Sequence, residues 1–285
     1  MAPLLVAVFD DETGARGGRG ILRDLHTDGT LTLYAMATIA RESKGAGLVI
    51  RQPLEPAAAT IAPAVGAAIG ALVTLLGGPI AAATRSVTSG LVSAVWDLDE
   101  AGFDAAFLGR ISRHLRAGSG AVIAEAEEDR QWSLDADMLA RGGRLFRHRL
   151  ASALLEERMM RELTSLRDEW YCFSRETVGE ARAGTRATVR RDRLQELHRA
   201  LDRTRARAQA LRREGMAKVT VIRAQAAALE GEARQAVEHR AASVMASFQA
   251  RAARLDDVAD RANSIVLPRA KRQMPKASGE GKADG

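Results

Sequence analysis

The first part of the chain alternates between short apolar runs and segments with helical periodicity. Residues 4–9 form an apolar run typical of a buried strand, and the acids that follow can cap a helix running to about His26. Residues 31–39 alternate between apolar and polar side chains, which is the period of a strand with two distinct faces. We expect residues 48–52 to return beside this strand as the second half of a hairpin.

The same alternation of strands and helices resumes after an interruption. Residues 104–115 have helical periodicity, and residues 121–125 form another apolar strand. The order strand, helix, strand, strand, insert, helix, strand is that of a split β-α-β unit. The pattern therefore predicts an α+β head, a ferredoxin-like sandwich, over residues 1–150. A further helix over 133–141 and a strand over 144–150 can extend its sheet.

An apolar insert over residues 57–97 interrupts the head. It opens with 28 consecutive residues that carry no charge. Its Gly-Gly-Pro sequence at 77–79 divides it into two helical arms, because glycine and proline are unfavourable inside a helix. Small residues recur at every fourth position of each arm, so they share one helix face and let two backbones approach closely. We predict a glycine-zipper helical hairpin that packs through Ala62, Gly66, Gly70, Thr74, Ala82, Ser86, Gly90 and Ala94.

The length of the insert leaves its environment open. Each arm offers about the 20 apolar residues that a membrane-spanning helix needs, but only when it is counted at full length. The many alanines and glycines, the polar Ser and Thr residues and Arg85 count against insertion, since a charge at mid-bilayer costs about 3 kcal/mol. The hairpin either inserts into or lies against a membrane, or it buries its faces in a soluble oligomer.

The second half of the chain is predicted to consist of long helices. Residues 151–267 contain no proline and only four glycines. Leu194, Leu197 and Leu201 begin a heptad seam, and apolar residues at three- and four-residue steps continue it. Because this stripe is narrow, a partner helix is needed to cover it. The region is either an extended rod or a folded-back helical hairpin with breaks near Gly179 to Gly184 and near Gly215.

Charge separates the two halves of the chain. The net charge is −2 over residues 1–150 and +8 over residues 151–285, and nearly all of the basic residues are arginines. Arginine pairs well with phosphates and carboxylates. After the last helix, the tail over residues 268–285 is rich in Lys, Pro and Gly and lacks apolar periodicity, so we expect it to be disordered.

Eleven of these arginines lie within residues 182–213, where only a few acids offset them. Such a stripe can bind lipid or nucleic-acid phosphates, or it can be the solvated face of a coiled coil. The predicted phosphate contacts are Arg186, Arg190, Arg191 and Arg193. Almost no aromatic side chains interleave with them, which disfavours stacking on single-stranded nucleic acid and makes nucleic acid the less favoured partner.

The motifs of catalysis and metal binding are absent from the sequence. The glycine-rich stretch 14–20 lacks the spacing of both phosphate-loop motifs, so we interpret it as a flexible helix start with solvated Arg16 and Arg19. The acids at 125–129 lack calcium-loop spacing and are interpreted as a solvated strand edge. The single cysteine, Cys172, excludes an intramolecular disulfide and is expected to be a packed thiol. We therefore expect a protein that is not an enzyme, with no cofactor, no metal and no small-molecule substrate.

Several segments of the first 150 residues together resemble a known family. They are the opening strand with its acidic end at 4–10, the stretch 28–41, the glycine-rich run 66–79, Trp96-Asp97-Leu98, and Gly142-Gly143 followed by Phe146-Arg147. This half of the chain is similar to a bacterial family of glycine-zipper, membrane-associated proteins, the domain of unknown function 1269. The resemblance implies a ferredoxin-like fold with an inserted glycine-rich hairpin, association with membranes and a link to stress response. It implies no catalytic residue, and Arg85 and Thr88 depart from its pattern.

These patterns predict a non-enzymatic homo-oligomer built from a head, a helical region and a tail. The head over 1–150 carries the insert 57–97, the coiled-coil-like region 151–267 serves oligomerisation or partner binding, and the tail covers 268–285. The expected partners are a second copy of the chain and membrane lipid. This places the protein on the cytoplasmic side of a membrane or in the cytoplasm. The alternative is a soluble oligomeric scaffold, or a nucleic-acid-associated protein that uses the Arg-rich helices.

Overall fold

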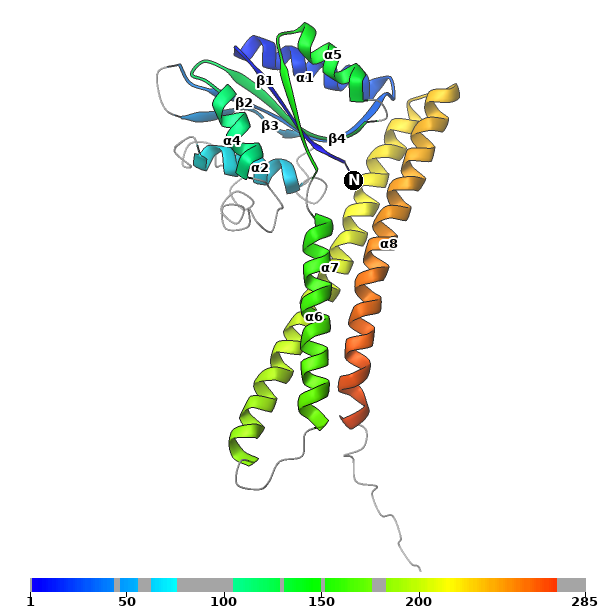
Figure 1. Ribbon diagram of the computed structural model, residues 1–285. Helices are drawn as coiled ribbons and strands as arrows, with labels where there is room; N and C mark the ends of the chain where they lie inside the picture. The colour runs from blue at the N-terminus through cyan, green and yellow to red at the C-terminus, as the bar shows by residue number, and fades with distance from the viewer. Residues whose placement is uncertain are drawn as a thin grey trace, which may run out of the picture. The chain divides into compact units, whose positions relative to one another are not determined.

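The chain has an α+β architecture, a five-stranded antiparallel sheet with helices followed by long helices (Figure 1). The computed structural model describes residues 2–43, 47–55, 63–75, 105–128, 131–149, 152–175 and 183–270. The described residues form two compact units. The head unit contains the residues up to Leu155 together with Leu211–Ala250, and the helical unit contains Glu156–Ala210 together with the residues from Arg251 onward.

The sheet has the strand order β3-β2-β4-β1-β5, with every neighbouring pair antiparallel. As a result β1 and β2 run parallel to each other with β4 between them, and β4 and β5 run parallel with β1 between them. The predicted hairpin is confirmed, since β2 pairs with β3, and the last strand extends the sheet as expected. The strands are β1 (Leu4–Phe9), β2 (Leu31–Arg41), β3 (Leu48–Glu55), β4 (Gly120–Glu128) and β5 (Arg144–His148).

Helices cover both faces of the sheet. Figure 1 shows α1 (Glu12–Thr27) and α5 (Gln131–Ala140) on one face, and α2 (Pro63–Leu75) and α4 (Ala105–His114) on the other. The helix α1 begins where the sequence predicts, because the Asp11 carboxylate accepts a hydrogen bond from the Gly14 N–H at 2.6 Å and caps the first turn.

The alternation of side chains along β1 divides the head into two apolar cores. Leu4, Val6 and Val8 pack with α2 and α4, whereas Leu5, Ala7 and Phe9 pack on the side of α1 and α5. The glycines of α1 allow close contact with Phe9, since a Cβ atom at Gly18 would lie 2.7 Å from Phe9 Cε2. The glycine-rich stretch is therefore helix interior that packs on an aromatic ring. Its interpretation as a flexible helix start is wrong.

The part of the insert that the structure describes is α2, which packs on the sheet with Val65, Ile69 and Leu72. Of the predicted zipper residues, Gly70 is buried, and no described atom lies within 4 Å of the place where a Cβ atom at Gly66 would be. In the described ranges no helix is long and apolar enough to cross a membrane. Packing of the two arms stays a prediction, because Ala62, Ala82, Ser86, Gly90, Ala94 and the side chain of Thr74 lie outside the described residues.

The second half of the chain forms α6 (Ser152–Arg175), α7 (Ala183–Ala227) and α8 (Gly231–Ala270). In the helical unit, Leu163 and Trp170 of α6 share a core with Leu197 and Leu201 of α7 and with Ala259 of α8. The predicted heptad seam is confirmed. The helices that cover it belong to the same chain.

One of the two expected helix breaks agrees with the structure, since α6 ends at Arg175 and α7 begins at Ala183, whereas the second fold-back lies at a different glycine from the one expected. The turn between α7 and α8 ends at Gly231, which has a φ of 58°, a conformation that favours glycine. Gly215 lies inside α7, where a Cβ atom would come within 2.7 Å of the Cβ of Phe248 in α8. The break expected near Gly215 is wrong in position, because that glycine permits close helix packing instead of ending a helix.

Candidate functional site, a buried polar cluster in the head unit

Polar side chains replace apolar ones toward one end of the sheet. Glu125 follows Ala121 and Ile123 on the same face of β4, at two-residue steps, yet only 1% of its surface is exposed. Thr32 and Tyr34 of β2 are buried as well. The segment that contacts these residues is the hairpin tip, which we define as Leu211–Ala250, the part of α7 and α8 that belongs to the head unit.

A β-bulge in β2 brings Tyr34 into this cluster. Leu33 pairs with Ala126 and Ala35 pairs with Glu125, so Tyr34 has no partner of its own on β4. An extra residue of this kind bends a strand and re-aims a side chain. The bulge explains why Leu33 and Ala35, two positions apart, pack in the cores on opposite faces of the sheet.

Lys218 of α7 lies at the centre of the cluster. Its ammonium group is 2.5 Å from Glu125 Oε1 and 2.8 Å from Glu214 Oε1, and it is 5.1 Å from the centroid of the Tyr34 ring. It also faces the ring of Phe248 at 5.3 Å. A cation between two carboxylates and over two aromatic rings is a well-compensated buried charge.

The surroundings shift the pKa values of these groups. Burial alone lowers the pKa of Lys218, but the carboxylates of Glu125 and Glu214 outweigh it and hold the pKa above its usual value. Burial raises the pKa of Glu125, and the nearby ammonium group offsets only part of this effect. Burial also raises the pKa of Tyr34, with a further contribution from the negative charges of Glu127 and Glu125. Lys218 is therefore charged and Tyr34 neutral at physiological pH.

A second group of polar contacts connects Gln225 of α7 with the start of β2. The Gln225 side-chain N–H donates to the carbonyl oxygens of Leu31 at 2.7 Å and of His26 at 2.5 Å. Its carbonyl oxygen accepts a hydrogen bond from the Thr32 hydroxyl at 2.6 Å. The Gln225 amide therefore meets both backbone and side-chain partners, which fixes its orientation.

Arg240 of α8 completes the network. Its guanidinium donates to the Thr32 hydroxyl oxygen at 2.6 Å and to the Gly29 carbonyl oxygen at 3.1 Å. Gly29 has a φ of 85°, and a Cβ atom there would lie 2.8 Å from Leu229 Cδ1. Glycine at this turn thus meets a backbone requirement and also lets the hairpin tip approach.

The cluster is a closed arrangement of paired charges and hydrogen bonds. In the described part of the chain, the Tyr34 hydroxyl and Glu125 Oε2 are buried and have no hydrogen-bond partner. The described residues contain no group of three His, Cys, Asp or Glu side chains placed to hold a metal ion. The geometry matches a specific contact between the sheet and the hairpin tip.

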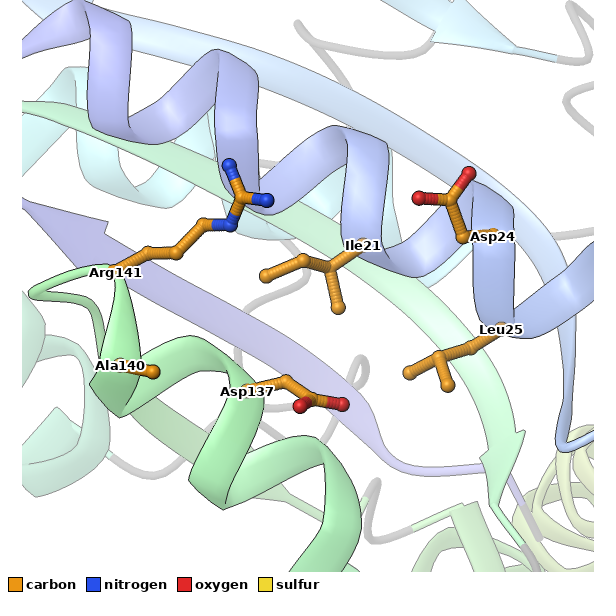
Figure 2. A pocket seen from close by; sticks show the side chains of 6 residues that line it. All are labelled: Ile21, Asp24, Leu25, Asp137, Ala140 and Arg141. Atoms are coloured by element: carbon orange, nitrogen blue, oxygen red, sulfur yellow. The ribbon is translucent and has the colours of Figure 1, made fainter.

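A shallow groove lies elsewhere on the head unit, between α1 and α5 (Figure 2). Its volume is about 280 Å³. None of its lining residues was predicted to belong to a binding site. They are Ile21, Asp24 and Leu25 of α1 with Asp137, Ala140 and Arg141 at the end of α5.

The arginines predicted to contact phosphates lie in the helical unit. Arg193 forms an ion pair with Glu169, and the Arg190 guanidinium lies 5.6 Å from the centroid of the Trp170 ring. Arg191 is exposed, and the side chain of Arg186 lies outside those described. Other members of the stripe also pair with acids of α6 and α8. These pairs are Arg203 with Glu162, Arg205 with Asp260, and Arg207 with Glu156.

Three expectations about individual side chains are wrong. Glu125 is buried against Lys218 instead of lying on a solvated edge. Arg19 is buried in α1, whereas Arg16 is exposed as expected. Cys172 is exposed and does not form a packed thiol. The burial of each of these side chains depends on the segments that the fold packs against it.

The sequence contained one signal that points to the cluster. Lys218 is the only lysine in residues 151–267, where every other basic residue apart from histidine is an arginine. A lysine ammonium fits into a compact site between two carboxylates, whereas the arginine fork demands a planar arrangement of acceptors. A single lysine in a region that otherwise uses arginine therefore indicates a position where the shape of the ammonium group matters.

The fold and the cluster together define an α+β head whose sheet forms polar contacts with the hairpin tip of the same chain. Comparisons of the sequence and structure with family models, with curated proteins and with solved structures found no match.

Proposed function

We propose that this chain is a non-enzymatic, self-associating protein that attaches to the cytoplasmic side of a membrane through its apolar insert. The observation that carries the proposal is the composition of that insert, with 28 consecutive uncharged residues and small residues at every fourth position. Its described part, α2, uses one side to cover the sheet. Beside Gly66, no described atom lies within 4 Å of the place where a Cβ atom would be. That side can receive a second helix at short distance.

The strand order supports a ferredoxin-like assignment for the head. Without β3, the order β2-β4-β1-β5 contains two β-α-β crossovers, each spanning one antiparallel strand. The crossover helices are α1 and α5, and β3 is an added edge strand. From the sequence we expected residues 104–115 to take the place of the second helix, but they form α4 on the opposite face. This arrangement agrees with the family resemblance drawn from the sequence.

The helical region supports a role in presenting the head or in binding a partner. Its heptad seam is covered within the chain, so the seam itself does not require a second copy. Arginines of the stripe pair with acids of neighbouring helices, which reduces the charge available for nucleic-acid phosphates. Membrane attachment through the insert is therefore the better-supported proposal.

The membrane part of the proposal is tested by fractionation of the full-length protein expressed in bacterial cells. We expect the protein in the membrane pellet after both carbonate and high-salt washes, because apolar attachment resists both treatments. Replacing Leu91 and Val95 of the second arm with Glu is expected to move it to the soluble pool. Release of the unmodified protein by salt alone, or a wholly soluble protein, would contradict attachment through the insert.

The self-association part is tested with a matched pair of glycine variants. Gly66→Leu places a large side chain on the zipper face, and Gly109→Leu makes the same change in α4. At both glycines no described atom lies within 4 Å of the place where a Cβ atom would be. We expect Gly66→Leu to reduce the assembly size in detergent by light scattering, with Gly109→Leu unchanged. Equal masses for both variants and the unmodified protein would overturn packing through the zipper face.

A further inference from the structure

The groove between α1 and α5 has an apolar floor and charged ends of opposite sign. Ile21, Leu25 and Ala140 supply the apolar lining. Figure 2 shows Arg141 at one end of the groove and Asp24 at the other, with Asp137 projecting from α5 between the two helices. Arg141 lies over Gly17, because a Cβ atom there would be 3.2 Å from its Nη1 atom.

The positive and negative ends are held apart by the helices themselves. Gly17 and Asp24 are seven positions apart on α1, which corresponds to about 10 Å along the helix axis. The Arg141 side chain therefore cannot contact Asp24 of the same chain while it lies over Gly17.

The charges of the groove lack partners within the described part of the chain. Asp24, Asp137 and Arg141 are exposed, and their side chains form no ion pair or hydrogen bond with a described residue. A nearby acid of the same helix behaves differently, since Asp135 pairs with Arg147 at 2.6 Å. An acid of α5 thus forms an ion pair where a described basic residue lies close to it. The acidic and basic side chains of the groove form no such pair with a described residue.

We infer that this groove is a contact surface for a second copy of the chain, related to the first by a two-fold axis through the groove. A two-fold rotation reverses the direction of the groove, so the positive end of each copy meets the negative end of the other. Arg141 of each chain then lies close to Asp24 and Asp137 of its partner, and the apolar linings face each other. The groove is complementary to itself in charge, which favours this partner over other apolar surfaces.

This inference deepens the proposed self-association and names a second surface for it. The residues of the groove belong to α1 and α5, whereas the insert is represented by α2 on the opposite face of the sheet. Pairing through the groove depends on charge and weakens with salt. Packing through the insert is apolar and does not weaken with salt. The two contacts therefore respond to different variants and conditions.

The test is a charge exchange in the full-length protein, kept in mild detergent and measured by sedimentation velocity at low salt. Arg141→Glu makes the groove wholly acidic, and Asp24→Arg combined with Asp137→Arg makes it wholly basic. We expect each variant alone to dimerise at least about tenfold more weakly than the unmodified chain, which corresponds to 1.4 kcal/mol. Mixing the two variants is expected to restore a dimer that contains one chain of each kind. Arg116→Glu, an exposed arginine after α4, is the control and should leave dimerisation unchanged.

The outcomes separate this inference from the proposed function. Unchanged dimerisation in both groove variants, or a mixture that does not form the mixed dimer, overturns the groove contact and leaves the Gly66→Leu test untouched. Loss and recovery by charge exchange support the groove contact even if the insert fails its own tests. A thermal unfolding midpoint equal to that of the unmodified chain confirms that each variant is folded.

Discussion

The sheet face that carries Ala121 and Ile123 is apolar where α2 and α4 cover it, and polar where the hairpin tip contacts its end. Val65, Ile69 and Leu72 of α2 pack with apolar side chains of the strands. Lys218, Gln225 and Arg240 of the hairpin tip instead meet a carboxylate, a hydroxyl group and backbone carbonyls. One sheet thus uses two kinds of packing along a single face.

The difference shows how stability and specificity are distributed in the head unit. Apolar burial is non-directional and stabilises the fold in proportion to the area removed from water. A buried ion pair adds little net stability compared with apolar residues of similar size, but any arrangement that separates its members is strongly unfavourable. The apolar part holds the layers together, and the polar part selects one position for the hairpin tip.

The largest expected effect comes from removing one member of the buried ion pair. Lys218→Met leaves the Glu125 carboxylate without its cation, and it should lower the free energy of unfolding by about 3–5 kcal/mol. Chemical denaturation followed by circular dichroism measures this change. Adding Glu125→Leu to the same chain should recover most of the loss. A double variant that is as unstable as Lys218→Met would contradict the assignment of the cost to the unpaired carboxylate.

The apolar part is expected to respond next most strongly. Leu72→Ala removes a fully buried side chain from the α2 face and should cost about 2–5 kcal/mol through lost burial and the cavity left behind. Leu72→Met keeps the volume and should cost less than about 1.5 kcal/mol. The same denaturation experiment compares them. Similar losses for both variants would show that shape, and not burial, dominates at this position.

A smaller effect is expected at Gln225. Gln225→Ala leaves the carbonyl oxygens of Leu31 and His26 without this donor, and the loss should be about 1–3 kcal/mol. Hydrogen exchange of the amides in β2 and in the hairpin tip should rise along with it. The control is Gln249→Ala, which makes the same change at an exposed glutamine of the same hairpin tip. Equal behaviour of the two variants would show that the amide contacts are not significant.

The smallest effect is the dependence of stability on alkaline pH. The pKa values of Lys218 and Tyr34 are raised in the fold, so above about pH 10 the unfolded chain loses these protons before the folded chain does. The unfolded state then binds fewer protons, and the free energy of unfolding falls as the pH rises, by at most about 1.4 kcal/mol per pH unit for each group. Tyr34→Phe should make this decline shallower. A decline of the same slope in that variant would exclude Tyr34 as a source.

The local elements of the head could be predicted because their signals are local. The alternation over 31–39 and the acid that caps α1 depend only on neighbouring residues. The strand and the cap both appear in the structure, although the bulge moves Leu33 and Ala35 to opposite faces of the sheet. The seam at Leu197 and Leu201 was visible for the same reason, since helical periodicity is a property of a single segment. These features required no knowledge of the rest of the fold.

The buried polar cluster could not be predicted because its members are distant in sequence. Glu125 and Lys218 are 93 positions apart, and Thr32 and Gln225 are 193 positions apart. An acid near the end of a strand has the same pattern whether it faces water or a lysine from another helix. The position of the fold-back at Gly231 was missed similarly, because a lone glycine in a helical stretch has the same pattern whether it begins a new helix, as Gly231 does, or lets Phe248 pack closely, as Gly215 does.

The packing of Phe9 between Gly18 and Gly143 constrains the order in which these three positions can change during evolution. Cβ atoms at Gly18 and Gly143 would each lie 2.7 Å from atoms of its ring, so the three positions share one volume although they are far apart in the chain. Neither glycine can gain a methyl group while the aromatic ring remains. In descendants of this protein, a larger residue at position 18 or 143 should become fixed only after position 9 has become smaller, so these sites should change in a set order.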